Sequence, residues 1–243
     1  MDLTVVLPAR NEAENLGQLV PSILATFDRH GIDGEVFVID DYSTDVTPDV
    51  LAQLESDRVR STRFPVNLGR AHGIAAGFHH AKGDAVAVMD SDRQYDPEDL
   101  PKLLAALASG ADVANGVRVD RADNPWRRTV SRTYNAIVMR AALDVRVEDA
   151  NSGLKMFTAD AIERMGYDPS PLRRGHRFLI AWAVATDLEI AEVPIKHFDR
   201  PAGRSYIKAF REARLTMLDL WTFRRTVIRP RKRRSKTLSG ARR

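Results

Sequence analysis

The chain has 243 residues, of which 44% are hydrophobic and 29% charged, and its formal net charge is +4. These values are typical of a folded domain with a hydrophobic core. The absence of cysteine excludes disulfides, thiolate metal sites and thiol catalysis. No hydrophobic run approaches the roughly 20 residues that span a bilayer, and the first residues lack the layout of a signal peptide, so we expect a cytosolic protein.

Hydrophobic periodicity predicts that strands and helices alternate along the first half of the chain. The expected strands are residues 3–7, 35–39, 58–62, 84–89 and 112–119. The first expected helix begins after Asn11, which serves as its N-terminal cap. Two more are expected at 47–55 and 71–81, and a fourth begins at Pro97. Short connections between alternating elements predict an α/β fold with a parallel sheet.

The alternation changes after residue 118. We expect a helix at 126–143, a strand at 154–157, helices at 159–165 and 178–185, and a strand at 188–193 that ends at Pro194. An amphipathic helix is predicted at 206–223 and leads into a basic tail. We therefore divide the chain into an α/β domain at 1–205 and an appendage at 206–243.

Polar residues follow three of the predicted strands. They are the segments PARNE at 8–12, DDYS at 40–43 and DSD at 90–92. The carboxyl ends of parallel strands lie at one edge of a sheet, where ligands bind. Acidic groups there can bind a nucleobase and a ribose. The chain lacks the glycine-rich fingerprints of dinucleotide-binding and P-loop proteins.

Asp90 and Asp92 suggest a site for a divalent metal. Side chains at i and i+2 of an extended segment point to the same side, so both carboxylates could bind one ion. Two carboxylates without cysteine suit Mg²⁺ or Mn²⁺, which also take water and substrate phosphates as ligands. The alternative is an ordinary acidic turn, because a D-x-D pattern is short and common.

Together these motifs resemble the inverting family 2 glycosyltransferases, which have the GT-A fold, a Rossmann-like, mostly parallel sheet flanked by helices. The resemblance rests on LPARNE at 7–12, DDYSTD at 40–45, NLG at 67–69 and DSD at 90–92. Further motifs resemble the branch of dolichol- and polyprenyl-phosphate mannosyl or glucosyl transferases, such as dolichol-phosphate mannose synthases. They are DRQ at 92–94 with PE at 97–98, SGLKMF at 152–157, EVP at 192–194, and Arg200 with GRS at 203–205.

The resemblance implies a role for each matching residue. The nucleoside pocket would be lined by Pro8, Arg10, Glu12, Ile39 and Asp41. The metal would be bound by Asp90, Asp92 and Gln94, with main-chain contacts from Met89 and Ser91. Phosphates of donor and acceptor would be held by Arg118, Arg128, Ser131 and Arg200, since arginine binds phosphate through two parallel hydrogen bonds. Catalysis would depend chiefly on Asp90, Asp92, Arg118 and Arg200.

The expected reaction is a single inverting displacement that moves mannose, or glucose, from a nucleotide sugar to polyprenyl or dolichyl phosphate. GDP-mannose is the preferred donor, and UDP-glucose is the second choice. Two departures from the family pattern bear on the acceptor. The segment 175–182 has no acidic residue to act as a base, which favours a phosphate acceptor, because a phosphate is already ionised; its nearest titratable group is His176. Tyr206 stands where that branch usually has lysine, which leaves donor and acceptor open; Lys208 or Arg204 could compensate.

The last 20 residues contain ten arginines and lysines and no acidic residue, so the rest of the chain is net acidic. A hydrophobic helix followed by a basic run favours a peripheral position on an anionic membrane surface, at its cytosolic face. Three alternatives remain: a soluble family 2 enzyme with a small-molecule hydroxyl acceptor, a nucleic-acid-binding protein on a transferase-like fold, and a merely solubilising tail. No aromatic stacking pattern supports nucleic acid.

Overall fold

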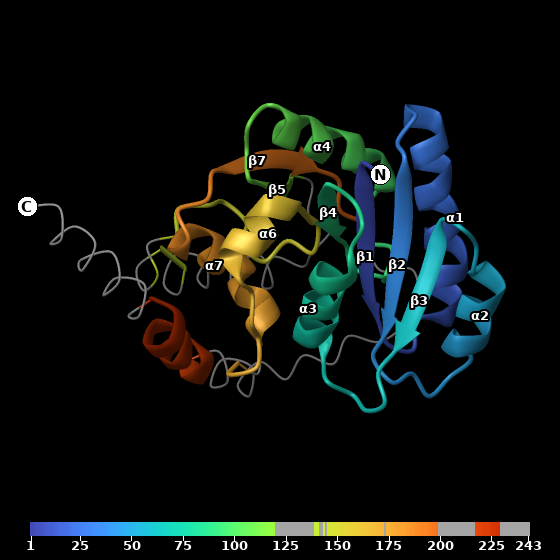
Figure 1. The fold of residues 1–243 in the computed structure, drawn as a ribbon, viewed down its shortest axis with the longest axis horizontal. Helices are drawn as coiled ribbons and strands as arrows, with labels where there is room; N and C mark the ends of the chain where they lie inside the picture. The colour runs from blue at the N-terminus through green and yellow to red at the C-terminus, as the bar shows by residue number, and fades with distance from the viewer. Residues whose placement is uncertain (120–138, 141–142, 144, 173, 199–216, 229–243) are drawn as a thin grey trace, which may run out of the picture.

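The computed structural model describes residues 1–119, 139–140, 143, 145–172, 174–198 and 217–228. In this part of the chain, a single mixed sheet lies between two layers of helices (Figure 1). The predicted helix at 126–143 lies almost entirely outside the described residues.

The sheet contains seven described strands in the order β3-β2-β1-β4-β6-β5-β7. Their bounds are β1 (Leu3–Ala9), β2 (Gly34–Asp40), β3 (Val59–Arg63), β4 (Ala85–Val88), β5 (Val113–Arg118), β6 (Lys155–Thr158) and β7 (Ile190–Ile195). β6 is antiparallel to both of its neighbours, and the other described pairings are parallel. The prediction of a mostly parallel α/β sheet is confirmed.

The strand order reverses beside β1. The chain proceeds outward from β1 to β2 and β3, and then returns to place β4 on the other side of β1. In such sheets the crevice outside the carboxyl ends of the strands at the reversal is the usual place for a ligand.

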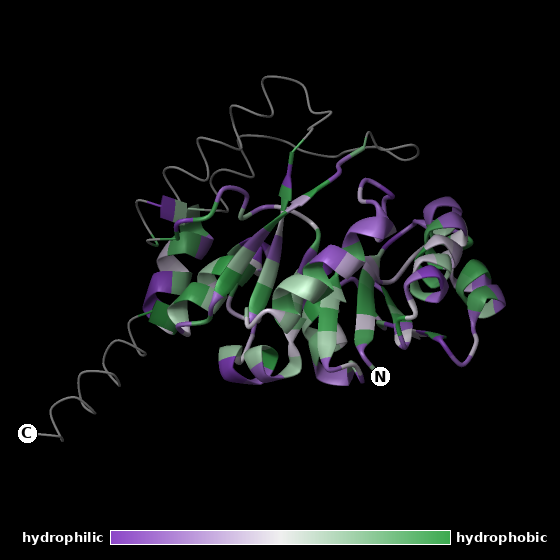
Figure 2. Ribbon diagram, turned by 90° about the horizontal axis from the view of Figure 1, so that it is seen from above, coloured by the Kyte–Doolittle hydropathy of each residue, from purple (hydrophilic) through white to green (hydrophobic). Residues whose placement is uncertain are grey.

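Helices cover both faces of the sheet. One face packs against α1 (Ala13–His30), α2 (Thr47–Leu54) and α4 (Leu100–Ala108), and the other against α3 (Arg70–His80), α6 (Ala159–Met165) and α7 (Leu179–Ala185). Short 3₁₀ turns, η1 (Pro97–Asp99) and η3 (Gly175–Phe178), precede α4 and α7. The strands are largely hydrophobic (Figure 2), because strands covered on both faces must be hydrophobic on both.

Alternate residues of β1 show this double burial. Val5 and Leu7 belong to the core beneath α1, whereas Val6 faces α3. Gly77 of α3 lies so close to Val6 that an added Cβ would be 2.2 Å from a Val6 methyl carbon. The absence of a side chain at Gly77 therefore permits the close approach of α3 to β1.

Two local predictions need correction. Asn11 was expected to cap α1, but the capping position is Glu12, and the Asn11 side chain accepts a hydrogen bond from the Thr44 backbone instead. The last strand was expected to end at Pro194, but β7 continues to Ile195. Proline is tolerated there because β7 pairs with β5 at the edge of the described sheet.

Residues 217–223 are helical and continue into η4 (Arg224–Ile228), a π-helical turn. Phe223 is fully buried and stacks on Phe178 with the ring centroids 5.1 Å apart. Met217, Leu218 and Trp221 are exposed. The remainder of the predicted 206–223 helix and residues 229–243 of the tail lie outside the described residues. No helix in the described part is both long and apolar enough to cross a bilayer.

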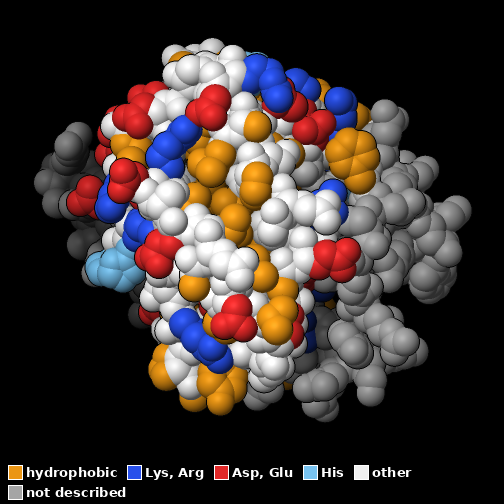
Figure 3. Space-filling model, turned by 90° about the vertical axis from the view of Figure 1, so that its right-hand side faces the viewer, with side chains coloured by type: hydrophobic (Ala, Val, Ile, Leu, Met, Phe, Trp, Pro, Cys, Tyr) orange, Lys and Arg blue, Asp and Glu red, His pale blue; other side chains and the backbone are white. Residues whose placement is uncertain are grey.

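Figure 3 shows the side of the molecule that carries α1, α2 and β3. Acidic and basic side chains alternate on it, with hydrophobic side chains between them. As far as the described residues cover this face, it is not a continuous basic stripe of the kind that binds a nucleic-acid backbone.

Candidate functional site

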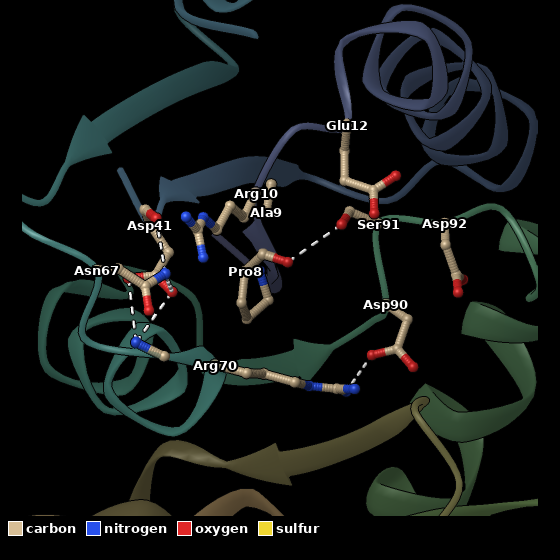
Figure 4. A pocket seen from close by; sticks show the side chains of 11 residues that line it. Pro8, Ala9, Arg10, Glu12, Asp41, Asn67, Arg70, Asp90, Ser91 and Asp92 are labelled. Atoms are coloured by element: carbon tan, nitrogen blue, oxygen red, sulfur yellow. Dashed lines mark hydrogen bonds and ion pairs between the residues drawn. The ribbon is translucent and has the colours of Figure 1, made fainter. Parts of the chain in front are cut away.

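A pocket of about 380 Å³ opens at the reversal of strand order, outside the carboxyl ends of β1, β2 and β4 (Figure 4). Four segments far apart in the sequence form its wall. The lining residues are Pro8, Ala9, Arg10, Glu12, Asp41, Asn67, Gly69, Arg70, Asp90, Ser91 and Asp92. Its size is within the range of pockets that hold small molecules.

Hydrogen bonds join the loops that form this wall. The backbone N–H of Asn11 donates to Ser43 Oγ at 2.9 Å, and the backbone N–H of Glu12 donates to Thr47 Oγ1 at 3.1 Å. Ser91 Oγ donates to the carbonyl of Pro8 at 3.1 Å. The loops after β1, β2 and β4 therefore hold one another in position.

Each of these three loops contains a non-glycine residue in the left-handed region. The φ angles are 55° for Asn11, 60° for Tyr42 and 61° for Arg93. Such residues are uncommon, cost roughly 1 kcal/mol or more, and cluster at binding sites. The chain thus turns sharply just after three adjacent strands and leaves the edge of the sheet open for a ligand.

Asp41 fixes the loop that precedes α3. Its carboxylate accepts hydrogen bonds from the backbone N–H groups of Leu68 (2.7 Å) and Gly69 (2.9 Å) and from Asn67 Nδ2 (2.9 Å). Asp41 is almost fully buried but still lines the pocket. Its oxygens are largely occupied by this loop, so any contact with a nucleoside would use their remaining lone pairs.

Asp90 and Asp92 both line the pocket, but they do not lie on an extended strand as expected. β4 ends at Val88, and Ser91 and Asp92 form a turn that precedes the left-handed Arg93. The argument from alternation along a strand is therefore wrong in its premise. The turn places both carboxylates at the same pocket.

The two carboxylates suit a divalent cation. The Arg70 guanidinium pairs with Asp90 Oδ1, which shows that a positive group is stabilised at this position. Among the described residues, no group of three or more His, Cys, Asp or Glu side chains is arranged to hold a metal on its own. Two carboxylates with the other positions left to water and phosphate are the usual protein contribution to a Mg²⁺ site. Asp90 and Asp92 therefore fit the predicted ion.

A buried charged network lies behind Asp90. Arg118 forms a bidentate ion pair with Asp149 through Nε (2.6 Å) and Nη2 (2.9 Å). Lys155 of β6 donates to the carbonyl of Ser152. Burial lowers the pKa of Lys155 to about 7, although the negative charge of Asp149 acts to raise it. Burial, followed by the charge of Asp90, raises the pKa of Tyr95 to about 12.

Gly153 packs directly against Asp90. A Cβ on Gly153 would lie 2.0 Å from Asp90 Oδ2 and 2.8 Å from the Tyr95 ring. Its backbone N–H donates to the Tyr95 hydroxyl at 2.6 Å. The turn before β6 is therefore a wall against which the Asp90 carboxylate rests.

The predicted site residues separate into three groups. Those that line the pocket are Pro8, Arg10, Glu12, Asp41, Asp90, Ser91 and Asp92. Those that do not are Ile39 and Met89, whose side chains are fully buried, Gln94, which donates from Nε2 to the Phe198 carbonyl at 3.1 Å, and Arg118, which pairs with Asp149. Those outside the described residues are Arg128, Ser131 and Arg200.

The sequence prediction assigned no role to Asn67, Gly69 or Arg70, although all three line the pocket. The NLG segment at 67–69 contributed to the resemblance, and its position between a strand and a helix could have suggested a contact with the site. The Arg70 contact depends on how α3 packs over β1 and β2, which no local pattern encodes.

The comparisons with known sequences cover most of the chain. The profile of glycosyl transferase family 2 matches residues 4–166. An undecaprenyl-phosphate 4-deoxy-4-formamido-L-arabinose transferase of Edwardsiella ictaluri is 32% identical over 206 residues, covering 84% of this chain and 62% of that protein. The protein of the same name from Pseudomonas aeruginosa is 32% identical over 224 residues, covering 90% of this chain and 64% of its own length. The chain thus spans less than two thirds of the length of these curated relatives.

Solved structures share the fold. Glucosyl-3-phosphoglycerate synthase from Mycobacterium tuberculosis, in complex with phosphoglyceric acid, matches with a TM-score of 0.67 at 22% identity, over 93% of this chain and 80% of that one. A complex of the same enzyme with Mn²⁺ and UDP-glucose matches with a TM-score of 0.66 at 21% identity, over 93% and 79%. At this identity the similarity establishes the fold alone.

Proposed function

The chain belongs to glycosyl transferase family 2, and from this we propose that it transfers a sugar from a nucleotide sugar to a polyprenyl phosphate. The expected family and the GT-A fold are confirmed. The observation that carries the proposal is the convergence of three strand ends on one pocket, which is lined by Pro8, Arg10 and Glu12 after β1, Asp41 after β2, and Asp90 and Asp92 after β4.

The donor would lie across this pocket. Its nucleoside would contact the loops after β1 and β2, where Arg10, Glu12 and Asp41 offer donors and acceptors. Its diphosphate would reach Asp90 and Asp92 through a divalent cation, which when bound stabilises the charge of the leaving nucleoside diphosphate. Arg70 is close enough to Asp90 to bind the same diphosphate.

The names of the curated relatives support a lipid-phosphate acceptor, since both are undecaprenyl-phosphate transferases. The composition of η3 and α7 also favours an acceptor that needs no base. η3 and α7 contain no acidic residue, and burial, followed by the charges of Arg70 and Arg177, keeps the pKa of His176 well below its usual value. A phosphate oxygen is already ionised at neutral pH and can attack without losing a proton.

The identity of the transferred sugar is a further part of this proposal. Mannose from GDP-mannose, or glucose from UDP-glucose, is what the sequence motifs favour. The names of the curated relatives add 4-deoxy-4-formamido-L-arabinose as a third candidate. We include all three in the test and retain Mg²⁺ or Mn²⁺ as the cofactor.

We also propose that the protein works at the cytosolic face of a membrane, where a polyprenyl phosphate is met. Exposed Met217, Leu218 and Trp221 lie beside Arg224 and Arg225, a combination that suits the headgroup region of an anionic bilayer.

The test is a radiolabel transfer assay with the full chain and Mn²⁺. Each of the three nucleotide sugars is offered with a short-chain polyprenyl phosphate, and with the matching polyprenol as the control acceptor. Labelled lipid should form with the phosphate and not with the polyprenol. Equal transfer to the polyprenol, or release of sugar only to small hydroxyl compounds, would reject the phosphate acceptor.

A further inference from the structure

Arg70 occupies an unusual place in the pocket. It is the first residue of α3, and its side chain crosses the pocket wall to pair with Asp90 through Nη2 (Figure 4). Its Nε is buried and has no hydrogen-bond partner among the described residues. A buried N–H without an acceptor is costly, so this guanidinium has a donor group left for another ligand.

The Asp90 carboxylate has little freedom to turn away from Arg70. Its Oδ2 lies against Gly153, so closely that a Cβ added to this glycine would be only 2.0 Å from the oxygen. Its other oxygen, Oδ1, is the one that Arg70 contacts. A divalent cation bound to Asp90 would therefore meet the guanidinium at the same carboxylate. Two positive groups at one carboxylate repel each other strongly in a partly buried site.

Other positive groups lie near Arg70. Its charge adds to burial in lowering the pKa of both Lys155 and His176, so these side chains are near enough to interact with it. Once the guanidinium leaves Asp90, repulsion from these basic groups favours a position in which it faces an anion in the pocket.

We propose that Arg70 is an exchangeable counter-ion: it neutralises Asp90 before a divalent cation binds, and it moves to the donor's diphosphate when the cation takes Asp90. The diphosphate half of this inference rests on the proposed function, since it requires a nucleotide-sugar donor. In this scheme, binding of the cation to Asp90 releases Arg70, and Arg70 can then bind the diphosphate of the nucleotide.

The experiment measures Mn²⁺ binding to the full chain by isothermal titration calorimetry without nucleotide, and then UDP and GDP binding in separate titrations at saturating Mn²⁺. The variants are Arg70→Met and Arg70→Gln, each first checked for a cooperative thermal transition. The control is Arg10→Met, which removes a positive charge from the same pocket but from a side chain that is directed toward Asp41 and forms no ion pair among the described residues.

Both Arg70 variants should bind Mn²⁺ about fivefold more tightly than the wild type, since a competing ion pair worth roughly 1 kcal/mol is removed. The Arg10 variant should change this affinity less than about twofold, because its charge is farther away and screened. With Mn²⁺ present, the Arg70 variants should bind whichever of UDP and GDP the wild type prefers at least about tenfold more weakly.

Unchanged or weaker Mn²⁺ binding in both Arg70 variants would overturn the inference, and so would undetectable Mn²⁺ binding in every variant. An equal gain in Arg10→Met would reduce the effect to net charge and would also overturn it. Unchanged nucleotide binding would reject the move to the diphosphate. None of these measurements involves sugar transfer, so a failed transfer assay would reject the proposed function without altering this result.

Discussion

Replacing Lys155 by methionine should change how stability depends on pH. Lys155 is 3% exposed, and burial is the main reason that its pKa falls from 10.5 to about 7. The unfolded chain therefore binds a proton that the folded protein has released between these two values, and wild-type stability rises with pH in this window. For a shift of this size, the wild type should gain about 2 kcal/mol relative to Lys155→Met between pH 7 and pH 9.

Methionine has a similar volume and removes the ammonium, while Arg118 still neutralises Asp149 in the variant. The assay is urea unfolding of both proteins at several pH values from 7 to 9, followed by circular dichroism. Lys196→Met is the control, because Lys196 is 63% exposed, and this variant should follow the wild-type curve. A constant difference between Lys155→Met and the wild type over this range would refute the reasoning.

Three further outcomes test the packing and the site. Gly77→Ala should destabilise the fold by about 1–3 kcal/mol, because the new methyl group would lie 2.2 Å from a Val6 methyl carbon. Gly17→Ala is the control and should stabilise the fold by roughly 0.5 kcal/mol, because the nearest neighbour of its new methyl group would be 3.9 Å away. The urea midpoints of both variants measure these changes. Asp92→Asn should lower Mn²⁺-dependent transfer about 100-fold or more in the radiolabel assay, and full turnover would disprove its metal role. Asp41→Asn should lower the thermal midpoint, by an amount equivalent to about 1–3 kcal/mol, since an amide cannot accept every bond that the carboxylate accepts from its loop; an unchanged midpoint would show that the loop does not depend on this charge.

The elements that the sequence predicted well are those with local signals at both ends. α6 has the predicted bounds, 159–165, because the Thr158 side chain caps its first turn and Gly166 ends it in a left-handed conformation. The antiparallel direction of β6 was not predicted. It depends on the path of the chain between β5 and β6, which no periodicity describes.

The candidate site also divides into residues that local sequence signals identified and residues whose role depends on tertiary packing. Residues at strand ends, such as Asp41 and Asp90, were identified because the edge of a parallel sheet gathers them whatever the details of each loop. Arg70 and Gly153 were missed, because their contacts with Asp90 arise from α3 and the turn before β6, which are distant in sequence. Gln94 was expected at the metal, but its amide nitrogen bonds the Phe198 carbonyl, and this also depends on tertiary packing.

The position of β6 has a consequence for the order of folding. β1 to β4 can pair with one another as soon as the chain reaches residue 88, and β4 then lacks only its second neighbour, β6. β5 has β6 and β7 as its neighbours, so it stays unpaired until residues 155–158 arrive and hydrogen-bond to β4 on one side and β5 on the other. Contacts of such long sequence separation form slowly. The insertion of β6 is therefore the step that joins the two halves of the sheet, and it also brings Gly153 against Asp90. The turn that carries Asp90 and Asp92 is therefore completed late in folding, after the strand that precedes it.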